Sequence, residues 1–138
     1  MKTKERLFNE IRTVCTATHV DFEKVSIELS EFIGHDKIID YYITKGKLPS
    51  SPEALFDIMV LGEKALYDYD MIKKGALLHF EPLNKITEVT EEFEGKDYLT
   101  VNFRIGEIWG GVFVQDKLSK SKNIRRFARV VINKIGKS

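Results

Sequence analysis

Two pairs of polar residues in a predicted strand region have the spacing that acid–base or cation chemistry needs. His79 and Glu81 are two positions apart, so they share a strand face and could form an acid–base pair. Asp68 and Asp70 alternate in the same way and could bind a cation, but no loop of the EF-hand type surrounds them, and we expect a solvated strand face. Because no nucleophile or cleft signature accompanies either pair, the sequence predicts no enzyme. An enzyme would need a pocket beside His79, Glu81 or Asp68.

The other candidate residues for chemistry are isolated. His19 and His35 lack the spacing of a histidine metal motif. Cys15 lies on the apolar side of a predicted helix with only Arg12 as a nearby cation, so we expect a buried small hydrophobic residue rather than a reactive thiol. Residues 106–111 contain glycines, but not with the spacing of a phosphate-binding loop. We therefore predict no metal and no cofactor.

The composition is that of one folded domain. The 138 residues are 43% hydrophobic and 31% charged, which argues against disorder. A single cysteine rules out an internal disulfide and favours a reducing compartment, so we expect a cytoplasmic protein. No apolar run follows residues 1–6 as in a signal peptide, and no stretch approaches the roughly 18 apolar residues of a membrane span.

The positive charge is concentrated at the C-terminal end. The net charge is +1, yet residues 117–138 contain eight Lys or Arg residues and no acid. Such a segment is either an anion-binding surface or a basic helix neutralised by the acidic remainder of the fold, and its apolar stripe favours the second interpretation. Nucleic-acid binding would need aromatic side chains among the cations. Phe127 is the only aromatic residue there and belongs to the apolar stripe, so we expect no nucleic-acid partner.

Three helices and seven strands would position these residues. Apolar spacing predicts helices over 3–17 and 22–33, with Asp21 as an N-cap and Gly34 as a stop, and a last helix over 116–135. The two leading helices must pack on the barrel or on another copy of the chain. Alternation, β-branched residues and turn residues predict strands over 37–44, 55–61, 65–71, 76–80, 86–93, 98–104 and 107–115. Glycines at 110 and 111 in the last strand indicate a bulge or a sharp bend, as small barrels require, and the alternative is a ligand that passes close to the backbone there.

The order of these elements resembles the pleckstrin-homology-like superfold, and is most similar to its bacterial and GRAM-type members. Residues 54–69 resemble the family's central hairpin, and residues 78–89 resemble its strand, Pro-Leu break and following strand. Residues 113–116 lead into a helix that contains Phe127, as in the family. The resemblance covers roughly residues 36–136. It implies an α+β fold in which about seven strands form a strongly bent antiparallel barrel, capped by the C-terminal helix. The chain would be one domain, with N-terminal helices over 1–35 and the barrel and capping helix over 36–138.

This resemblance implies a binding scaffold. It places the loops after the first, third and sixth strands at the open end of the barrel, where they form a basic rim. The rim consists of Lys45, Lys47, Lys73, Lys74 and Arg104. However, the Lys and Arg-x-Arg pattern of phosphoinositide-binding members is absent, and the only tryptophan, Trp109, falls in the last predicted strand instead of the last helix. We therefore predict a non-enzymatic module for protein–protein interaction or self-association. The alternative is a peripheral membrane module in which the rim binds anionic lipid headgroups.

Overall fold

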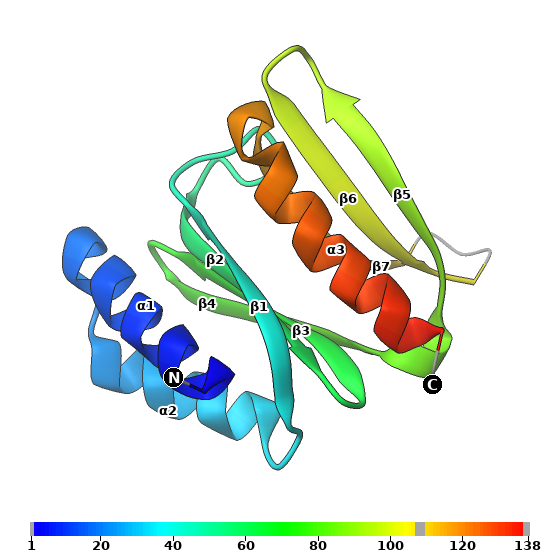
Figure 1. Ribbon diagram of the computed structural model, residues 1–138. Coiled ribbons are helices and arrows are strands. Elements are labelled where there is room, and N and C mark those ends of the chain that lie inside the picture. Colours follow the sequence, from blue (N-terminus) through cyan, green and yellow to red (C-terminus); the bar gives the residue numbers. More distant parts are fainter. Residues whose placement is uncertain (1, 107–109, 137–138) are drawn as a thin grey trace.

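The computed structural model describes residues 2–106 and 110–136 and contains two antiparallel sheets and three α-helices (Figure 1). The helices are α1 (Thr3–Thr18), α2 (Phe22–Ile33) and α3 (Ser121–Ile135). The first sheet, in the order β1-β2-β3-β4, contains β1 (Ile38–Lys45), β2 (Ala54–Gly62), β3 (Ala65–Ile72) and β4 (Gly75–Pro82). The second sheet contains β5 (Ile86–Glu94), β6 (Tyr98–Ile105) and β7 (Gly111–Lys117). Short 3₁₀ turns, Leu83–Lys85 and Leu118–Lys120, precede β5 and α3.

The boundaries of α2 follow from its capping residues. The Asp21 carboxylate accepts a hydrogen bond from the Glu23 backbone N–H at 3.0 Å, as predicted for an N-cap. Gly34 ends α2 with φ 64°, a conformation that glycine adopts without strain. Both predicted helices are confirmed to within one residue by their observed bounds.

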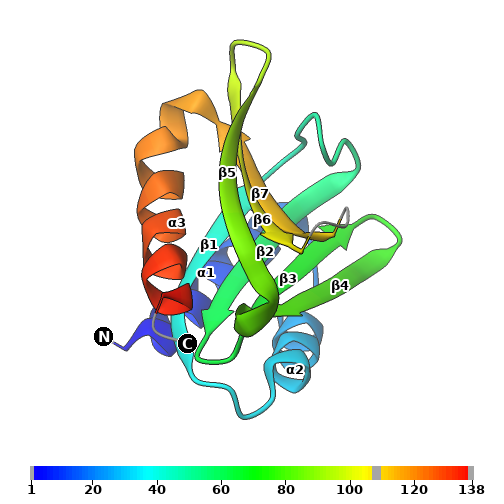
Figure 2. The same cartoon turned by 90° about the vertical axis from the view of Figure 1, so that its right-hand side faces the viewer.

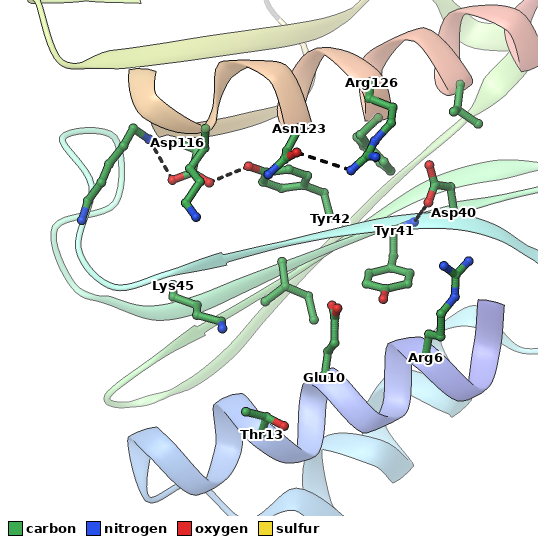
Figure 3. A pocket seen from close by; sticks show the side chains of 15 residues that line it. Arg6, Glu10, Thr13, Asp40, Tyr41, Tyr42, Lys45, Asp116, Asn123 and Arg126 are labelled. Atoms are coloured by element: carbon green, nitrogen blue, oxygen red, sulfur yellow. Dashed lines mark hydrogen bonds between the residues drawn. The ribbon is translucent and has the colours of Figure 1, made fainter. Parts of the chain in front are cut away.

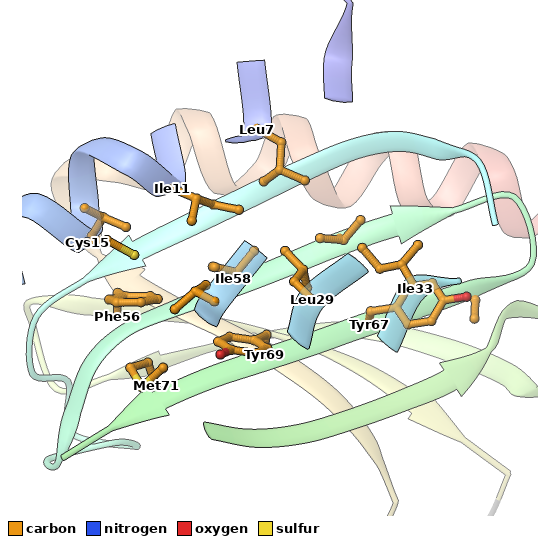
Figure 4. Packing of buried hydrophobic residues seen from close by; sticks show 14 residues of the cluster. Leu7, Ile11, Cys15, Leu29, Ile33, Phe56, Ile58, Tyr67, Tyr69 and Met71 are labelled. Atoms are coloured by element: carbon orange, nitrogen blue, oxygen red, sulfur yellow. The ribbon is translucent and has the colours of Figure 1, made fainter. Parts of the chain in front are cut away.

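The first sheet is covered on both faces. Its outer face packs against α1 and α2, as Figures 1 and 4 show. Leu7 and Ile11 of α1 and Leu29 of α2 are fully buried there against Phe56 and Tyr69 of the sheet. The leading helices therefore use their apolar stripes inside this chain, and neither stripe is left over for another copy.

The inner face of the first sheet packs against the second sheet and α3. Met59 and Leu66 contribute from the first sheet, Phe103 from β6, and Ile124 and Phe127 from α3. All five side chains are buried. The last helix thus lies against the interior, as its predicted stripe requires, and the fold has a helical layer, a central sheet, and a third layer made of the second sheet and α3 (Figure 2).

The strands differ from the expected closed barrel. Within the described residues, no strand of the first sheet is hydrogen-bonded to a strand of the second. Pro82 explains one break, because it ends β4 without a backbone N–H to donate, and the 3₁₀ turn after it redirects the chain into the second sheet. The last strand begins at Gly111 instead of 107, so the paired glycines precede or open β7 and do not interrupt it. Residues 107–109, with Trp109, lie outside the described residues.

Candidate functional site

A groove of about 750 Å³ lies between α1 and α3, with β1 as its floor (Figure 3). Such a volume is typical of ligand-binding clefts. β1 is an edge strand of the first sheet, so one side of its backbone faces this groove rather than another described strand. The lining residues come from α1, β1, β7 and α3 and from the 3₁₀ turn before α3. They are Arg6, Glu10, Thr13, Asp40, Tyr41, Tyr42, Ile43, Lys45, Asp116, Lys117, Lys120, Asn123, Arg126, Phe127 and Val130.

Two tyrosines hold the acids of the groove floor. The Tyr42 hydroxyl donates a hydrogen bond to Asp116 Oδ2 at 2.6 Å, which ties β1 to the end of β7. Burial, followed by this contact with Asp116, raises the pKa of Tyr42 far above its usual value. Tyr41 faces Glu10 of α1, and burial together with that carboxylate raises the pKa of Tyr41 to about 12. The acids are therefore engaged by groups of the groove itself.

Asp40 covers part of the free edge of β1. Its Oδ1 accepts a hydrogen bond from the backbone N–H of Tyr41 at 2.9 Å, so this donor is not bonded to the neighbouring strand. Burial raises the pKa of Asp40, and the hydrogen bond and the charges of Arg126 and Arg6 act in the opposite direction. A carboxylate thus takes the place that a carbonyl of an added strand would occupy.

The groove is basic in balance. Five of its lining residues are Lys or Arg and three are Asp or Glu. Lys45 and Lys117 line it from the ends of β1 and β7, and Lys120 lines it from the 3₁₀ turn before α3. In the described part of the chain, none of these three lysines forms an ion pair. The groove therefore offers positive charge that the fold does not neutralise.

The predicted rim residues are divided between two places. Lys45 and Lys47 lie at the β1–β2 connection and Lys73 and Lys74 at the β3–β4 turn, and antiparallel pairing puts these two connections at the same end of the first sheet (Figure 2). All four lysines are exposed. Arg104 lies near the end of β6, where its Nη2 contacts Glu92 Oε1 at 3.0 Å. The structure thus groups the lysines and pairs Arg104 with an acid of β5.

The basic last helix is partly neutralised within the fold. Arg125 contacts both carboxylate oxygens of Glu91 on β5, at 2.9 and 3.1 Å. Lys134 pairs with Glu63, which follows β2. Phe127 is buried in the interior, as its position on the apolar stripe predicts. This supports the interpretation of a basic helix paired with an acidic body for part of its charge.

The acidic strand face is partly covered by the second sheet and is not the fully solvated face that was expected. Asp68 and Asp70 point between the two sheets, because Tyr67 and Tyr69 occupy the opposite face against α1 and α2. Their Oδ1 atoms are buried. Alternation along a strand shows which residues share a face, but not whether another layer covers that face.

Sequence reasoning missed Asp57, the third acid of this region. It lies opposite Asp70 in the β2–β3 register. Its signal was a single carboxyl in the otherwise apolar run of residues 54–61. His79 and Glu81 do share a face, with Nε2 and Oε1 2.7 Å apart. A small hollow beside His79 is lined by all three aspartates.

Other sequence expectations concern single residues and metals. Cys15 is a free thiol and is buried, as expected, and burial raises its pKa. Among the residues that the structure describes, no group of three His, Cys, Asp or Glu side chains is arranged to hold a metal ion.

Comparison with known proteins adds no family assignment. Across the described ranges, none of the helices combines the length and the apolar character that crossing a bilayer requires. No protein-family model matches this chain, and no curated protein matches it significantly.

Proposed function

We propose that this chain is a cytoplasmic, non-enzymatic binding module of the pleckstrin-homology-like and GRAM-like type. It binds another protein, or a second copy of itself, by holding an extended acidic segment in the groove between α1 and α3. The observation that carries this proposal is the edge of β1, which faces an open, basic groove with its Tyr41 N–H covered only by the adjacent Asp40 carboxylate.

An edge strand in a groove favours recognition by strand addition. An extended peptide can pair with the unpaired backbone groups of such a strand, while the walls of the groove select its side chains. Here α1 and α3 form the walls. In the free protein the Asp40 carboxylate accepts the hydrogen bond of the Tyr41 N–H. A backbone carbonyl of the bound segment would take the place of this carboxylate.

The charges of the groove favour an acidic segment. Asp116 and Asp40 already accept hydrogen bonds from groups of the groove. Lys45, Lys117 and Lys120 have no ion-pair partner among the described residues. Complementary charge of this kind mainly accelerates association and excludes basic partners.

The order of the elements supports the resemblance on which the module type is based. Seven antiparallel strands followed by an amphipathic helix extend from residue 38 to residue 135. α1 and α2 are an addition whose apolar faces pack on the first sheet. A partner therefore has the groove, and not a bare helical stripe, as its binding surface.

A fluorescently labelled decapeptide of alternating glutamate and valine tests this proposal by fluorescence anisotropy. We expect binding that weakens with added salt and falls about tenfold in the double variant Lys117→Glu, Lys120→Glu, a loss of about 1.4 kcal/mol. Lys122→Glu is the matched control, because Lys122 is exposed on α3 but does not line the groove. Equal losses in the two variants, or no binding of the peptide, would contradict the proposal.

The alternative, binding of anionic lipid, is supported by the exposure of Lys45, Lys47, Lys73 and Lys74 at one end of the first sheet. It predicts flotation with phosphatidylcholine vesicles that contain phosphatidylserine, and loss of flotation in the double variant Lys73→Glu, Lys74→Glu. These two lysines do not line the groove. Flotation that survives this charge reversal would exclude the lipid alternative.

A further inference from the structure

A second hollow, of about 180 Å³, lies at the edge of the space between the two sheets. Its walls come from the connection before β2, from β2, β3 and β4, and from β7. The lining residues are Ser51, Asp57, Asp68, Asp70, Leu77, Leu78, His79 and Phe113. This cavity is separate from the groove, since the two share no lining residue.

Strand register brings the three carboxyl groups together. Asp57 of β2 lies directly opposite Asp70 of β3. Asp68 lies opposite His79 of β4. The carboxyl groups of Asp57 and Asp68 also interact with each other, and this interaction raises the pKa of Asp57.

The cluster is short of hydrogen-bond donors. In each of the three aspartates Oδ1 is buried and has no hydrogen-bond partner. Burial raises the pKa of all three carboxyls, and the neighbouring acid adds to this at Asp57 and Asp70; the pKa of Asp70 reaches about 6. His79 faces Asp68 and lowers its pKa in part. Buried carboxyl oxygens without donors are costly, and a donor-rich cation would remove that cost.

The mouth of the cavity is apolar, in contrast to its acidic floor. Leu77 is 58% exposed and Phe113 is 40% exposed, although both are large apolar residues. Apolar side chains at an opening above an acidic floor match a guest with a hydrocarbon part and a cationic end. The ring of Phe113 can also attract a cation.

We propose that this cavity binds a primary alkylammonium group. An ammonium carries three N–H donors, and the floor presents three buried carboxyl oxygens that lack a donor. Its alkyl chain would lie against Leu77 and Phe113 at the mouth. Among the described residues, no group of three His, Cys, Asp or Glu side chains is arranged to hold a metal ion. The guest is a free amine or the side chain of a lysine.

Calorimetric titration with n-butylammonium chloride tests the proposal. We expect saturable binding and an affinity at least tenfold higher at pH 7.5 than at pH 5, because protons compete with the ammonium group for the carboxyls of the cavity and the pKa of Asp70 is about 6. Asp57→Asn and Asp70→Asn should each lower the affinity about tenfold. Glu91→Gln, at an exposed carboxylate on β5, is the control and should leave it unchanged.

Three further titrations decide between guests. Tetramethylammonium has the charge but no N–H donor, so we expect no binding; equal binding of tetramethylammonium would overturn the proposal. Tighter binding of calcium than of butylammonium, or unchanged affinity in both asparagine variants, would overturn it as well. N-acetyl-lysine methylamide separates the two sources of the ammonium group. If it binds as tightly as butylammonium, the guest is a lysine side chain, and if only butylammonium binds, the guest is a free amine.

Discussion

The groove and the cavity contain the same kind of side chain in opposite situations. In the groove, Asp116 accepts a hydrogen bond from Tyr42 and Asp40 accepts one from the Tyr41 N–H. In the cavity, Asp57, Asp68 and Asp70 each have a buried Oδ1 atom without a hydrogen-bond donor. The groove acids therefore accept hydrogen bonds from neighbouring groups, whereas each cavity acid has a carboxyl oxygen without a donor.

The contrast shows why the location of acids in the sequence is a poor guide to their role. Both sets lie on strands or at their ends, and both are partly covered. The difference is that the groove also contains tyrosine hydroxyls and Arg126. The cavity offers only His79 and Ser51 as polar neighbours of its acids. Hydrogen-bond donors from other helices and strands decide whether a buried carboxyl is satisfied or left without a partner.

The largest effect should come from replacing the ionisable carboxyl of Asp57 with a neutral amide. The pKa of Asp57 is raised in the folded chain. At pH values between the ordinary pKa of an aspartate and this raised pKa, the folded chain keeps a proton that the unfolded chain has lost. The contribution of Asp57 to stability is therefore complete at low pH and is lost as the pH rises. Asp57→Asn should therefore raise the free energy of unfolding at pH 7.5 by at least about 1 kcal/mol. The gain should shrink toward pH 4. Urea unfolding at pH values between 4 and 8 measures both.

For Asp70 the same dependence of stability on pH should fall in a narrower pH range. Its pKa rises from an ordinary value of 3.8 to about 6, so Asp70→Asn should change the slope of stability against pH mainly between these values. A wild-type chain whose stability increases from pH 5 to pH 7.5, with no change in either asparagine variant, would show that the cavity acids are satisfied like those of the groove.

Removing a donor from the groove should have the opposite sign. Tyr42→Phe leaves Asp116 without the hydroxyl that donates to it, and we expect a loss of about 1–2 kcal/mol in the free energy of unfolding, as for a hydrogen bond to a charged group. Tyr98→Phe is a matched control at a partly buried tyrosine of β6. If the two variants unfold at the same urea concentration, Asp116 does not depend on Tyr42 and the contrast with the cavity fails.

Much of this fold could be predicted from local patterns. Asp21 and Gly34 place both ends of α2, and the alternation of Tyr67 with Asp68 places two opposite faces of β3, because caps and strand periodicity depend on neighbours in the chain. The separation into two sheets was not predicted, since pairing between distant strands leaves no local signal. Pro82 before the 3₁₀ turn was the available hint.

The candidate site was less predictable than the fold. The lysines of the rim could be assigned to connections, but the groove depends on how α1 and α3 lie beside β1, which only packing determines. The same holds for Asp57, whose neighbours Asp68 and Asp70 belong to another strand. A sequence shows the face of each residue, and the structure shows what lies opposite that face.

A smaller effect is expected at the edge of β1. Asp40→Ala removes the acceptor of the Tyr41 N–H, and we expect a loss of about 1 kcal/mol or less in stability. The amide hydrogen of Tyr41 should exchange faster with solvent, as NMR can measure, while the exposed Asp97→Ala control leaves it unchanged. Unchanged exchange in Asp40→Ala would mean that the edge has another cover, and strand addition there would be excluded.

The smallest effect should come from an acid on the open surface, which sets the baseline for both hollows. Glu91 is held by two contacts from Arg125, yet both side chains are nearly half exposed. Water and salt screen such a pair, so Glu91→Gln should have the same urea midpoint as the wild-type chain within experimental error. This should hold at 50 and at 500 mM sodium chloride, where the Debye length is about 14 and about 4 Å. Glu94→Gln, on the same strand and exposed, is the control. If Glu91→Gln lowers the free energy of unfolding as much as Tyr42→Phe does, hydrogen-bond geometry and not burial determines the stability that an acid contributes. The difference between the groove and the cavity would then be one of geometry alone.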